Sequence, residues 1–252
     1  MKFTPPVIDY RKIRPNNAFS KEYRHFWTLL FWVFHYVVFS ILEYVNTPER
    51  CTLITHPWDD KIPFLEIFVI PYLLWFVALI AIHAYTLLYD IPLYKRLISY
   101  IALTYTTALI IFAVFPNWQN LRPTEFERDN FLVDFMKYFY ANVDTPTNVL
   151  PSLHVVGSMA VMCTVLHSKR IKNPVFKGIV VVVCILISIS TVFLKQHSVW
   201  DVIAAIPICI IAEIVCFQID YKKLFQRKKA LSQPALSKEL AVSEDTESPK
   251  NE

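Results

Sequence analysis

The chain has 252 residues, of which 55% are hydrophobic, 15% aromatic and only 18% charged, and its mean hydropathy is +0.38. Soluble domains usually carry about a quarter charged residues, so the composition argues against a soluble enzyme, a disordered chain and a disulfide-stabilised secreted fold. The formal net charge of +4 does not indicate nucleic acid, because the positions of the basic residues have a simpler explanation in membrane topology.

Six stretches are long and apolar enough to cross the hydrocarbon core of a bilayer, which takes about 20 helical residues. They cover residues 25–45, 64–88, 97–115, 152–168, 175–194 and 198–218. The sequence therefore predicts an all-α fold, a polytopic membrane bundle of six transmembrane helices. We expect three parts, namely a cytoplasmic tail at 1–24, a membrane domain at 25–218 and a polar, acidic and disordered cytoplasmic tail at 219–252.

Lysine and arginine are distributed unevenly among the segments that flank these stretches. With Lys177 counted in the loop before it, 19 of the 25 lie in alternate segments that include both chain ends, and six lie in the other loops. By the positive-inside rule, both termini are predicted to be cytoplasmic, and the loops at 46–63, 116–151 and 195–197 to face outside. The basic clusters then contact lipid headgroups, so the expected partners are membrane lipids and not nucleic acid.

Three groups of polar residues fall on this predicted outer side. They are Asn120-Leu121-Arg122-Pro123, the run from Asp144 to His154, and the run from Ser190 to Asp201. Polar groups inside or at the rim of a bilayer are costly and often functional. Because the topology rests on lysine and arginine positions alone, the gathering of all three groups at one membrane face is independent support for a site there.

The most specific pattern is the pair His197 and Asp201, spaced i, i+4 at the start of the last predicted helix. At that spacing both side chains share one helix face. The carboxylate can accept a hydrogen bond from one imidazole nitrogen, which leaves the other nitrogen as a base or nucleophile. A purely structural hydrogen bond is the alternative for this pair.

Two further segments suit a phosphate. Pro151 and Ser152 open the fourth predicted helix, where free N–H groups and the hydroxyl would form an anion cradle. Arg122 offers a planar donor fork, and His154 could protonate a departing oxygen. The structural alternatives are a helix cap at Ser152 and a turn at Arg122-Pro123.

A zinc site made of His154, His197 and Asp201 is another alternative. These residues lack the usual ligand spacing, and the neighbouring Arg122 and Lys195 would repel a cation. We therefore expect neither a metal nor another cofactor.

At these residues the sequence resembles the type 2 phosphatidic acid phosphatase superfamily, membrane and vanadium-haloperoxidase-like enzymes that transfer phosphoryl groups through a histidine. Arg122-Pro123 is similar to the first signature of that family, and Pro151-Ser152-Leu153-His154 to the second, with Leu in place of Gly. Ser190, His197 and Asp201 match the third at the family spacing. The resemblance covers roughly residues 25–218, including the six spans.

Two positions depart from the family pattern. Phe115 stands where the family has Lys, and Thr191 where it has Arg, and both of the missing groups bind phosphate in the family. Lys195, two residues before His197, is a candidate replacement charge. The PSLH form resembles a branch related to inositol phosphorylceramide synthases and their bacterial phosphatase-like relatives.

The resemblance implies a role for each residue. His197 would attack phosphorus to give a phosphohistidine, with Asp201 orienting it. His154 would protonate the leaving alkoxide and then activate water or another acceptor. The phosphoryl oxygens would be held by basic and hydroxyl side chains, which are Arg122, Ser152, Lys195 and Ser190.

The loop at 116–150 is long for a plain connection. Phe131, Phe135, Tyr138 and Phe139 recur in it at helical spacing, which predicts a short helix in the membrane interface beside the site. The alternative is that these aromatic side chains pack against the bundle and touch no substrate.

These observations predict an integral membrane lipid phosphatase with its active site on the extracytoplasmic face. Its substrate would be a lipid phosphomonoester or pyrophosphate. Two alternatives stay open. One is a phosphotransferase that moves a phospho-headgroup between lipids. The other is a non-catalytic transporter or scaffold, which the departures at Phe115 and Thr191 favour.

Overall fold

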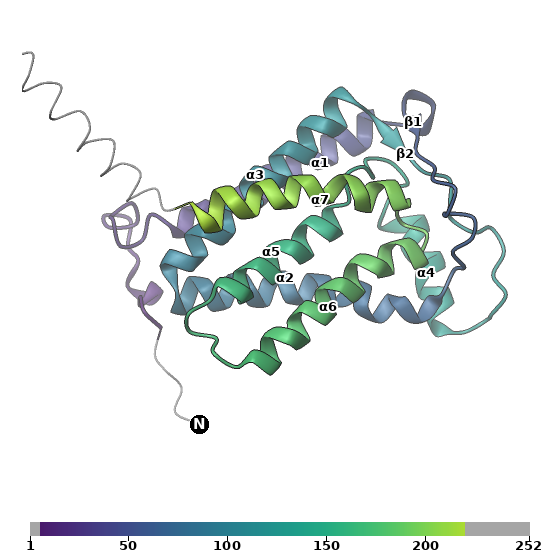
Figure 1. Cartoon of the computed structure of the whole chain (residues 1–252). Helices are drawn as coiled ribbons and strands as arrows, with labels where there is room; N and C mark the ends of the chain where they lie inside the picture. Colours follow the sequence, from purple (N-terminus) through teal and green to yellow (C-terminus); the bar gives the residue numbers. More distant parts are fainter. Residues whose placement is uncertain (1–5, 220–252) are drawn as a thin grey trace, which may run out of the picture.

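The computed structural model describes residues 6–219, which form a bundle of long helices (Figure 1). The predicted disordered tail at 219–252 lies outside the described residues from position 220 onward. The described part contains seven α-helices. They are α1 (Leu30–Val45), α2 (Val69–Tyr89), α3 (Ile91–Val114), α4 (Phe131–Asn142), α5 (Leu153–His167), α6 (Pro174–Phe193) and α7 (Val199–Glu213).

Five helical segments within residues 6–219 are long and apolar enough to cross a membrane. They are Phe26–Val45, Glu66–Tyr89, Ile91–Val114, Pro174–Phe193 and Val199–Gln218. The remaining predicted span forms α5, which is apolar but has only 15 residues. The chain is therefore an all-α, multi-pass membrane protein with five long apolar helices and a shorter one, and the sidedness stays a prediction.

The third span begins earlier than the sequence predicted, at Ile91 instead of residue 97. Asp90 alone joins α2 to α3, and its carboxylate accepts a hydrogen bond from the Leu93 N–H at 3.2 Å, as an N-cap residue does. Pro92 lies in the first turn of α3, where its missing N–H costs nothing. Lys95 and Arg96, which were expected in a loop, therefore belong to the helix.

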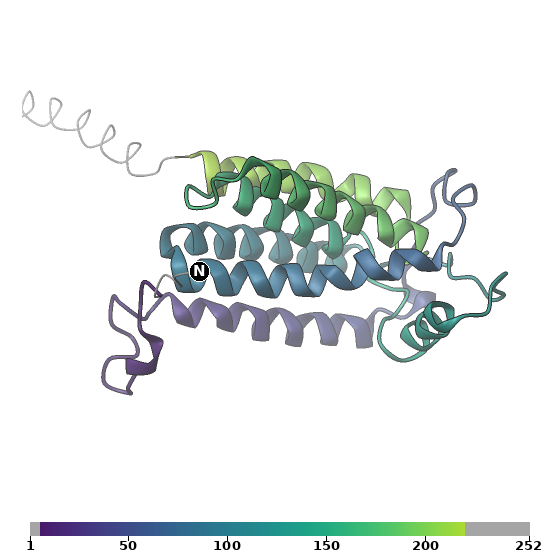
Figure 2. The ribbon, with the colours of Figure 1, turned by 90° about the horizontal axis from the view of Figure 1, so that it is seen from below.

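Helix α5 lies at the centre of the bundle and packs against α2, α3, α6 and α7 (Figures 1 and 2). Small side chains on α5, including Gly157, Ser158 and Ala160, are buried against these neighbours. Small residues allow close approach of helices, which is the main source of packing energy between helices in lipid. The helix that carries His154 is therefore the most enclosed of the bundle.

The outer faces of the surrounding helices are apolar and exposed. Examples are Val37 and Ile41 on α1, Ile80 on α2 and Ile211 on α7, which are 50%, 56%, 70% and 59% exposed. Apolar surface of this extent is unfavourable in water but suits contact with lipid chains. The distribution agrees with a bundle whose helices face the bilayer.

The loops at 46–65, 115–152 and 194–198 gather at one end of the bundle (Figure 2). Two short parallel strands join them, β1 (Thr52–Leu53) and β2 (Asn117–Trp118), with Thr52 opposite Asn117. Trp118 also bridges to Thr147. This small sheet is an addition to the predicted all-α fold, and it ties two loops that the sequence keeps far apart.

Helix α4 at the same end confirms the predicted short helix in the long loop. Some of its aromatic residues pack against the bundle and others face outward, so both expectations for them are met in part. Phe139 is buried against the bundle, whereas Phe131 and Tyr138 are 79% and 62% exposed. One face of α4 therefore holds it against the bundle, and the opposite face is free to contact the membrane interface.

Candidate active site

His197 lies in the tight turn that joins α6 to α7. The turn passes through Lys195 with a φ of 52°. The backbone N–H groups of Gln196 and His197 both donate to the Thr191 carbonyl, at 2.9 and 3.1 Å. The turn thus holds the His197 backbone against the end of α6.

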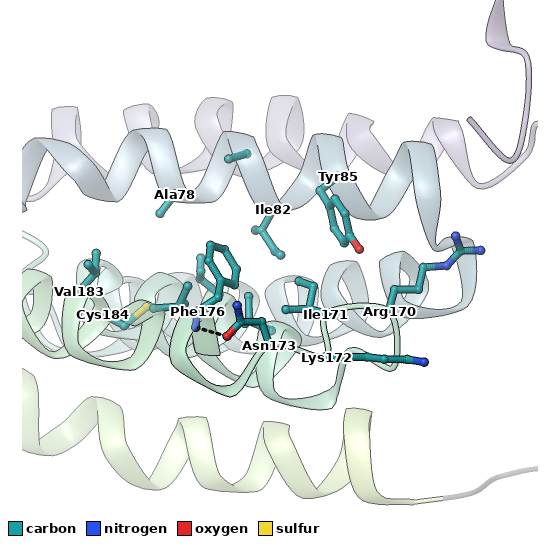
Figure 3. Close-up of a pocket in the computed structure, with 14 residues that line it drawn as sticks. Ala78, Ile82, Tyr85, Arg170, Ile171, Lys172, Asn173, Phe176, Val183 and Cys184 are labelled. Carbon is teal, nitrogen blue, oxygen red and sulfur yellow. Dashed lines mark hydrogen bonds between the residues drawn. The ribbon is translucent and has the colours of Figure 1, made fainter. Parts of the chain in front are cut away.

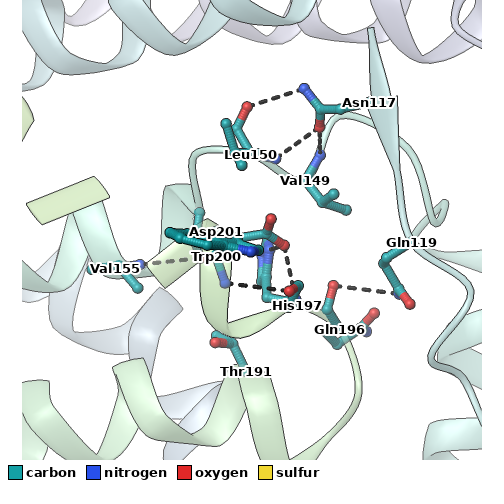
Figure 4. Close-up of polar contacts among 12 residues, drawn as sticks. Asn117, Gln119, Val149, Leu150, Val155, Thr191, Gln196, His197, Trp200 and Asp201 are labelled. Carbon is teal, nitrogen blue, oxygen red and sulfur yellow. Dashed lines mark hydrogen bonds and ion pairs between the residues drawn. The ribbon is translucent and has the colours of Figure 1, made fainter. Parts of the chain in front are cut away.

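Asp201 orients the His197 ring as the i, i+4 spacing predicted. His197 Nδ1 lies 3.0 Å from Asp201 Oδ2, and the same oxygen accepts the Ser198 N–H at 2.9 Å (Figure 4). Asp201 is fully buried and forms a capping box with Ser198 at the start of α7. An ionised Asp201 requires the proton on Nδ1, so the Nε2 lone pair of His197 is left for chemistry.

Asp59, from the loop before α2, is a second anchor of this turn that sequence reasoning missed. Its carboxylate accepts the Ser198 hydroxyl at 2.6 Å and the Val199 N–H at 2.9 Å, and it is buried. Its carbonyl accepts the Lys195 ammonium at 2.5 Å. Because Asp59 lies more than 130 residues before these partners, no local pattern could have indicated the contact.

The segment before α5 is shaped by two asparagines. The Asn117 side-chain oxygen accepts the N–H groups of Val149 and Leu150, both at 2.8 Å (Figure 4). Asn148 has a φ of 56°, a conformation that asparagine tolerates, and its side-chain oxygen accepts a hydrogen bond from Asn46 at 2.7 Å. These contacts set where α5 begins and hence where His154 lies.

His154 faces His197 and is enclosed by aromatic rings. The two imidazole centroids are 5.8 Å apart. On the α2 side, the His154 ring stacks on Tyr72 at 4.5 Å and lies 4.3 Å from the ring of Trp75. His154 Nε2 is buried and has no hydrogen-bond partner within residues 6–219. The structure therefore brings the two histidines together at one end of the bundle.

A small cavity of about 50 Å³ lies between the two histidines and the loop at 144–149. That volume compares with about 30 Å³ per water molecule in the liquid, so it admits a small polar group but no lipid tail. Gln196 also lines the cavity. Its side-chain nitrogen is buried without a hydrogen-bond partner among the described residues, which makes it a donor that the sequence analysis overlooked.

Arg122 lies next to this cavity, but protein acceptors occupy most of its guanidinium. Its Nη2 donates to Asp144 Oδ2 at 3.1 Å, to the Thr145 carbonyl at 2.8 Å and to Gln196 Oε1 at 2.9 Å. Its Nε is buried and unpaired among the described residues. Burial raises the pKa of the Asp144 carboxyl, and the Arg122 charge opposes that rise, so Asp144 loses its charge more readily than a solvated aspartate as the pH falls.

The other predicted phosphate contacts have different partners in the structure. The Ser152 hydroxyl caps α5 by accepting the Val155 N–H at 3.5 Å, and the Ser152 N–H donates to the Asp201 carbonyl at 3.1 Å. The Ser190 hydroxyl donates to the Ile187 carbonyl at 2.6 Å within α6. Neither serine lines the 50 Å³ cavity.

Three more residues do not line the cavity. They are Lys195 and the two positions that depart from the family pattern, Phe115 and Thr191. The Lys195 ammonium bonds the Asp59 carbonyl, and burial lowers its pKa while the charges of Asp59 and Asp60 oppose the shift. Phe115 is 41% exposed at the end of α3. Thr191 is buried, and its hydroxyl donates to the Ser188 carbonyl at 2.8 Å. In this conformation Arg122 bonds three of the residues that line the cavity, whereas the ammonium of Lys195 bonds Asp59 outside it.

The family model described as PAP2 superfamily matches residues 93–225, which is more than half of the chain. The chain belongs to the PAP2 superfamily. No curated protein and no solved structure matches it significantly.

Membership of the PAP2 superfamily indicates a phosphatase that acts on phosphate esters, generally those of lipids. The matched range contains each of the residues predicted for the site. They are Arg122, Ser152, His154, Ser190, Lys195, His197 and Asp201. Among residues 6–219, no group of three or more His, Cys, Asp or Glu side chains is arranged to hold a metal ion.

Gly157 gives a test of the packing around His154 in this PAP2 protein. A Cβ added there would lie 2.6 Å from Trp75 Nε1 and 2.8 Å from the Tyr105 hydroxyl. We expect Gly157→Ala to displace the Trp75 ring from His154, to cost about 1–3 kcal/mol from overpacking, and to lower kcat. The measurements are the melting temperature in detergent and the rate of phosphate release.

The matched control is Gly178→Ala, because nothing lies within 4 Å of a Cβ at that position. Alanine is the better helix former by about 0.5–1 kcal/mol, so this variant is expected to melt at the same or a higher temperature with unchanged activity. An equal rise in melting temperature for both variants would contradict the tight contact at Gly157.

Proposed function

We propose that this protein is a metal-independent lipid phosphatase that hydrolyses a lipid phosphomonoester or pyrophosphate through a phosphohistidine at His197. One observation carries the proposal. A buried carboxylate holds Nδ1 of His197, and a second histidine faces the same ring across a cavity large enough for a small polar group. Membership of the PAP2 superfamily supports the same class of chemistry.

In the first step, the lone pair on His197 Nε2 attacks phosphorus and the bond from phosphorus to the lipid oxygen breaks. A protonated His154 donates its proton to the departing alkoxide, which leaves as the lipid alcohol. Asp201 stabilises the positive charge that develops on the His197 ring. The rings of Tyr72 and Trp75 hold the His154 ring in place beside His197.

In the second step, neutral His154 accepts a proton from water as the water oxygen attacks phosphorus. The phosphorus–nitrogen bond breaks, inorganic phosphate leaves, and both histidines return to their starting states. The negative charge on the phosphoryl oxygens needs donors in both steps. Gln196 Nε2 and Arg122 Nε, both buried and unpaired among the described residues, are the donors we propose.

We keep three further residues as proposed phosphate contacts, Ser152, Ser190 and Lys195, although each has another hydrogen-bond partner in the structure. Lys195 would have to exchange the Asp59 carbonyl for a phosphate oxygen. Ser190 would have to release a carbonyl of its own helix. The proposed donors therefore differ from the set that the sequence suggested, because they include Gln196, whose side-chain nitrogen has no partner among the described residues.

We also propose that this end of the bundle faces outside the cytoplasm, as the distribution of basic residues predicts. A lipid could then keep its tails in the bilayer and present its phosphate sideways to the cavity at headgroup depth. The exposed face of α4, with Phe131 and Tyr138, is suited to lie in the interface beside that entry path.

The test is to trap the phosphoenzyme. Purified protein with EDTA and ³²P-labelled phosphatidate is expected to release labelled phosphate and, after rapid quenching, to carry a label that acid removes and base does not. With p-nitrophenyl phosphate, whose leaving group needs no proton, His154→Asn is expected to accumulate the label, and His197→Ala to carry none. Label on His197→Ala, or no phosphate release by the wild type, would overturn the proposal.

A phosphotransferase is the second candidate, and one feature of the cavity favours it. Phe39, Val149 and Leu153 form an apolar wall beside the two histidines, and Leu153 replaces the glycine of the usual motif. An apolar wall can exclude water and hold an alcohol acceptor, as expected for the branch related to inositol phosphorylceramide synthases. Transfer of a labelled headgroup to a second lipid, with little free phosphate, would replace hydrolysis as the function.

A further inference from the structure

A second and larger hollow lies far from the histidines, between α2 and α6 with α5 as its floor. Its volume is about 650 Å³, within the range of roughly 300–1,000 Å³ that is usual for small-molecule sites. Its walls are apolar. Figure 3 shows Ala78 and Ile82 of α2 opposite Phe176, Val183 and Cys184 of α6. We call this hollow the α2–α6 groove.

The α2–α6 groove is separate from the candidate active site. Its floor includes Val161 and Val165 of α5, and Val165 follows His154 by 11 residues, about 16 Å along a helix. The groove therefore reaches the opposite end of the bundle, where α5 connects to α6. None of the residues that line it takes part in the proposed chemistry.

At that end the groove becomes basic. Arg170 and Lys172 line it where the loop between α5 and α6 passes (Figure 3). Asp90 is the acidic neighbour of Arg170, at 3.9 Å, and the Arg170 side chain is still 49% exposed. Lys172 makes no ion pair within residues 6–219, and the N-terminus of α6, next to it, is the positive end of a helix dipole.

We propose that the α2–α6 groove binds one acyl chain of an anionic bilayer phospholipid, with its phosphate held by Arg170 and Lys172. Apolar walls alone would not select a lipid, because lipid tails are as apolar as the surrounding side chains. The basic end supplies the selectivity, since paired basic residues between membrane helices attract anionic headgroups. A lipid bound there has a structural role, and its binding does not depend on hydrolysis at the histidines.

The test is native mass spectrometry of the full chain in detergent, with phosphatidylglycerol and phosphatidylcholine of identical chains. The wild type is expected to retain phosphatidylglycerol in preference. In the double variant Arg170→Gln/Lys172→Gln, the ratio of bound phosphatidylglycerol to bound phosphatidylcholine is expected to fall about 10- to 30-fold. Each basic residue contributes roughly fivefold to this ratio. The matched control is Lys12→Gln/Arg14→Gln, which removes the same charges away from the groove and is expected to keep the preference.

A second pair of variants tests the walls. Ala81 lines the groove and is exposed into it, whereas Ala84, one turn along α2, is exposed but does not line it. Ala81→Phe is expected to reduce retention of both lipids severalfold, and Ala84→Phe to change neither. Equal lipid preference in the wild type and the double variant, or equal losses in Ala81→Phe and Ala84→Phe, would overturn the proposal whatever the phosphatase activity.

Discussion

The His197→Ala variant is expected to lose about 10³-fold or more of kcat, because His154, the proposed acid, is the only other histidine that lines the cavity in the described part of the chain. The loss should appear with every lipid phosphate that the wild type accepts, since the variant lacks the atom that bonds to phosphorus. The measurement is steady-state phosphate release in EDTA, compared with the wild type at equal protein concentration.

The variant also leaves Asp201 buried with one hydrogen bond fewer, at a cost of about 1–3 kcal/mol in folding free energy. Its melting temperature should therefore be measured alongside, and His197→Asn, which keeps a polar side chain beside Asp201, should be equally inactive. The control is His167→Ala at the opposite end of the bundle, which is expected to stay active. Substantial turnover by both His197 variants would mean that another group attacks phosphorus.

Asp201→Asn is expected to lower kcat by about 10²- to 10⁴-fold, with a smaller change in KM. An asparagine oxygen at the position of Oδ2 would still accept both the Ser198 N–H and the His197 Nδ1–H, and the NH₂ would take the position of Oδ1, which has no partner among the described residues. The variant therefore keeps the ring and its tautomer but removes the negative charge that stabilises the positive charge developing on His197 as Nε2 bonds to phosphorus.

A capping role for Asp201 alone would give a different result. Loss of a helix cap costs about 0.5–2 kcal/mol of stability and lowers the amount of folded protein, while kcat per folded molecule stays the same. The control is Glu213→Gln, which neutralises a carboxylate in the last turn of the same helix and is expected to keep kcat. A kcat for Asp201→Asn equal to that of Glu213→Gln would show that the carboxylate only caps α7.

The sequence alone was sufficient for the features that depend on local pattern. Runs of about 20 apolar residues predicted the helices, because a spanning segment must satisfy its backbone internally and match the bilayer thickness. The i, i+4 spacing of His197 and Asp201 predicted their hydrogen bond, since a helix brings those positions onto one face. The aromatic spacing in the long loop likewise predicted α4.

The ends of the helices were harder to predict from the sequence. The prediction placed a loop before residue 97 because Lys95 and Arg96 interrupt the apolar run. In the structure both lie in α3, where long basic side chains near a helix end can reach polar surroundings. Hydropathy therefore located the apolar core of the span but not the start of the helix.

The composition of the site was decided by tertiary structure. Asp59 anchors the His197 turn, Trp75 covers His154, and Arg122 is engaged by Asp144 and Gln196. Each contact joins segments that are distant in the chain, so no spacing rule encodes it. The sequence determined which chemical groups are available and on which helices they lie. Only the packing of α2, α5 and α7 decided which of them meet, because short contacts across a bundle depend on how its helices approach one another and on the loops that close its end.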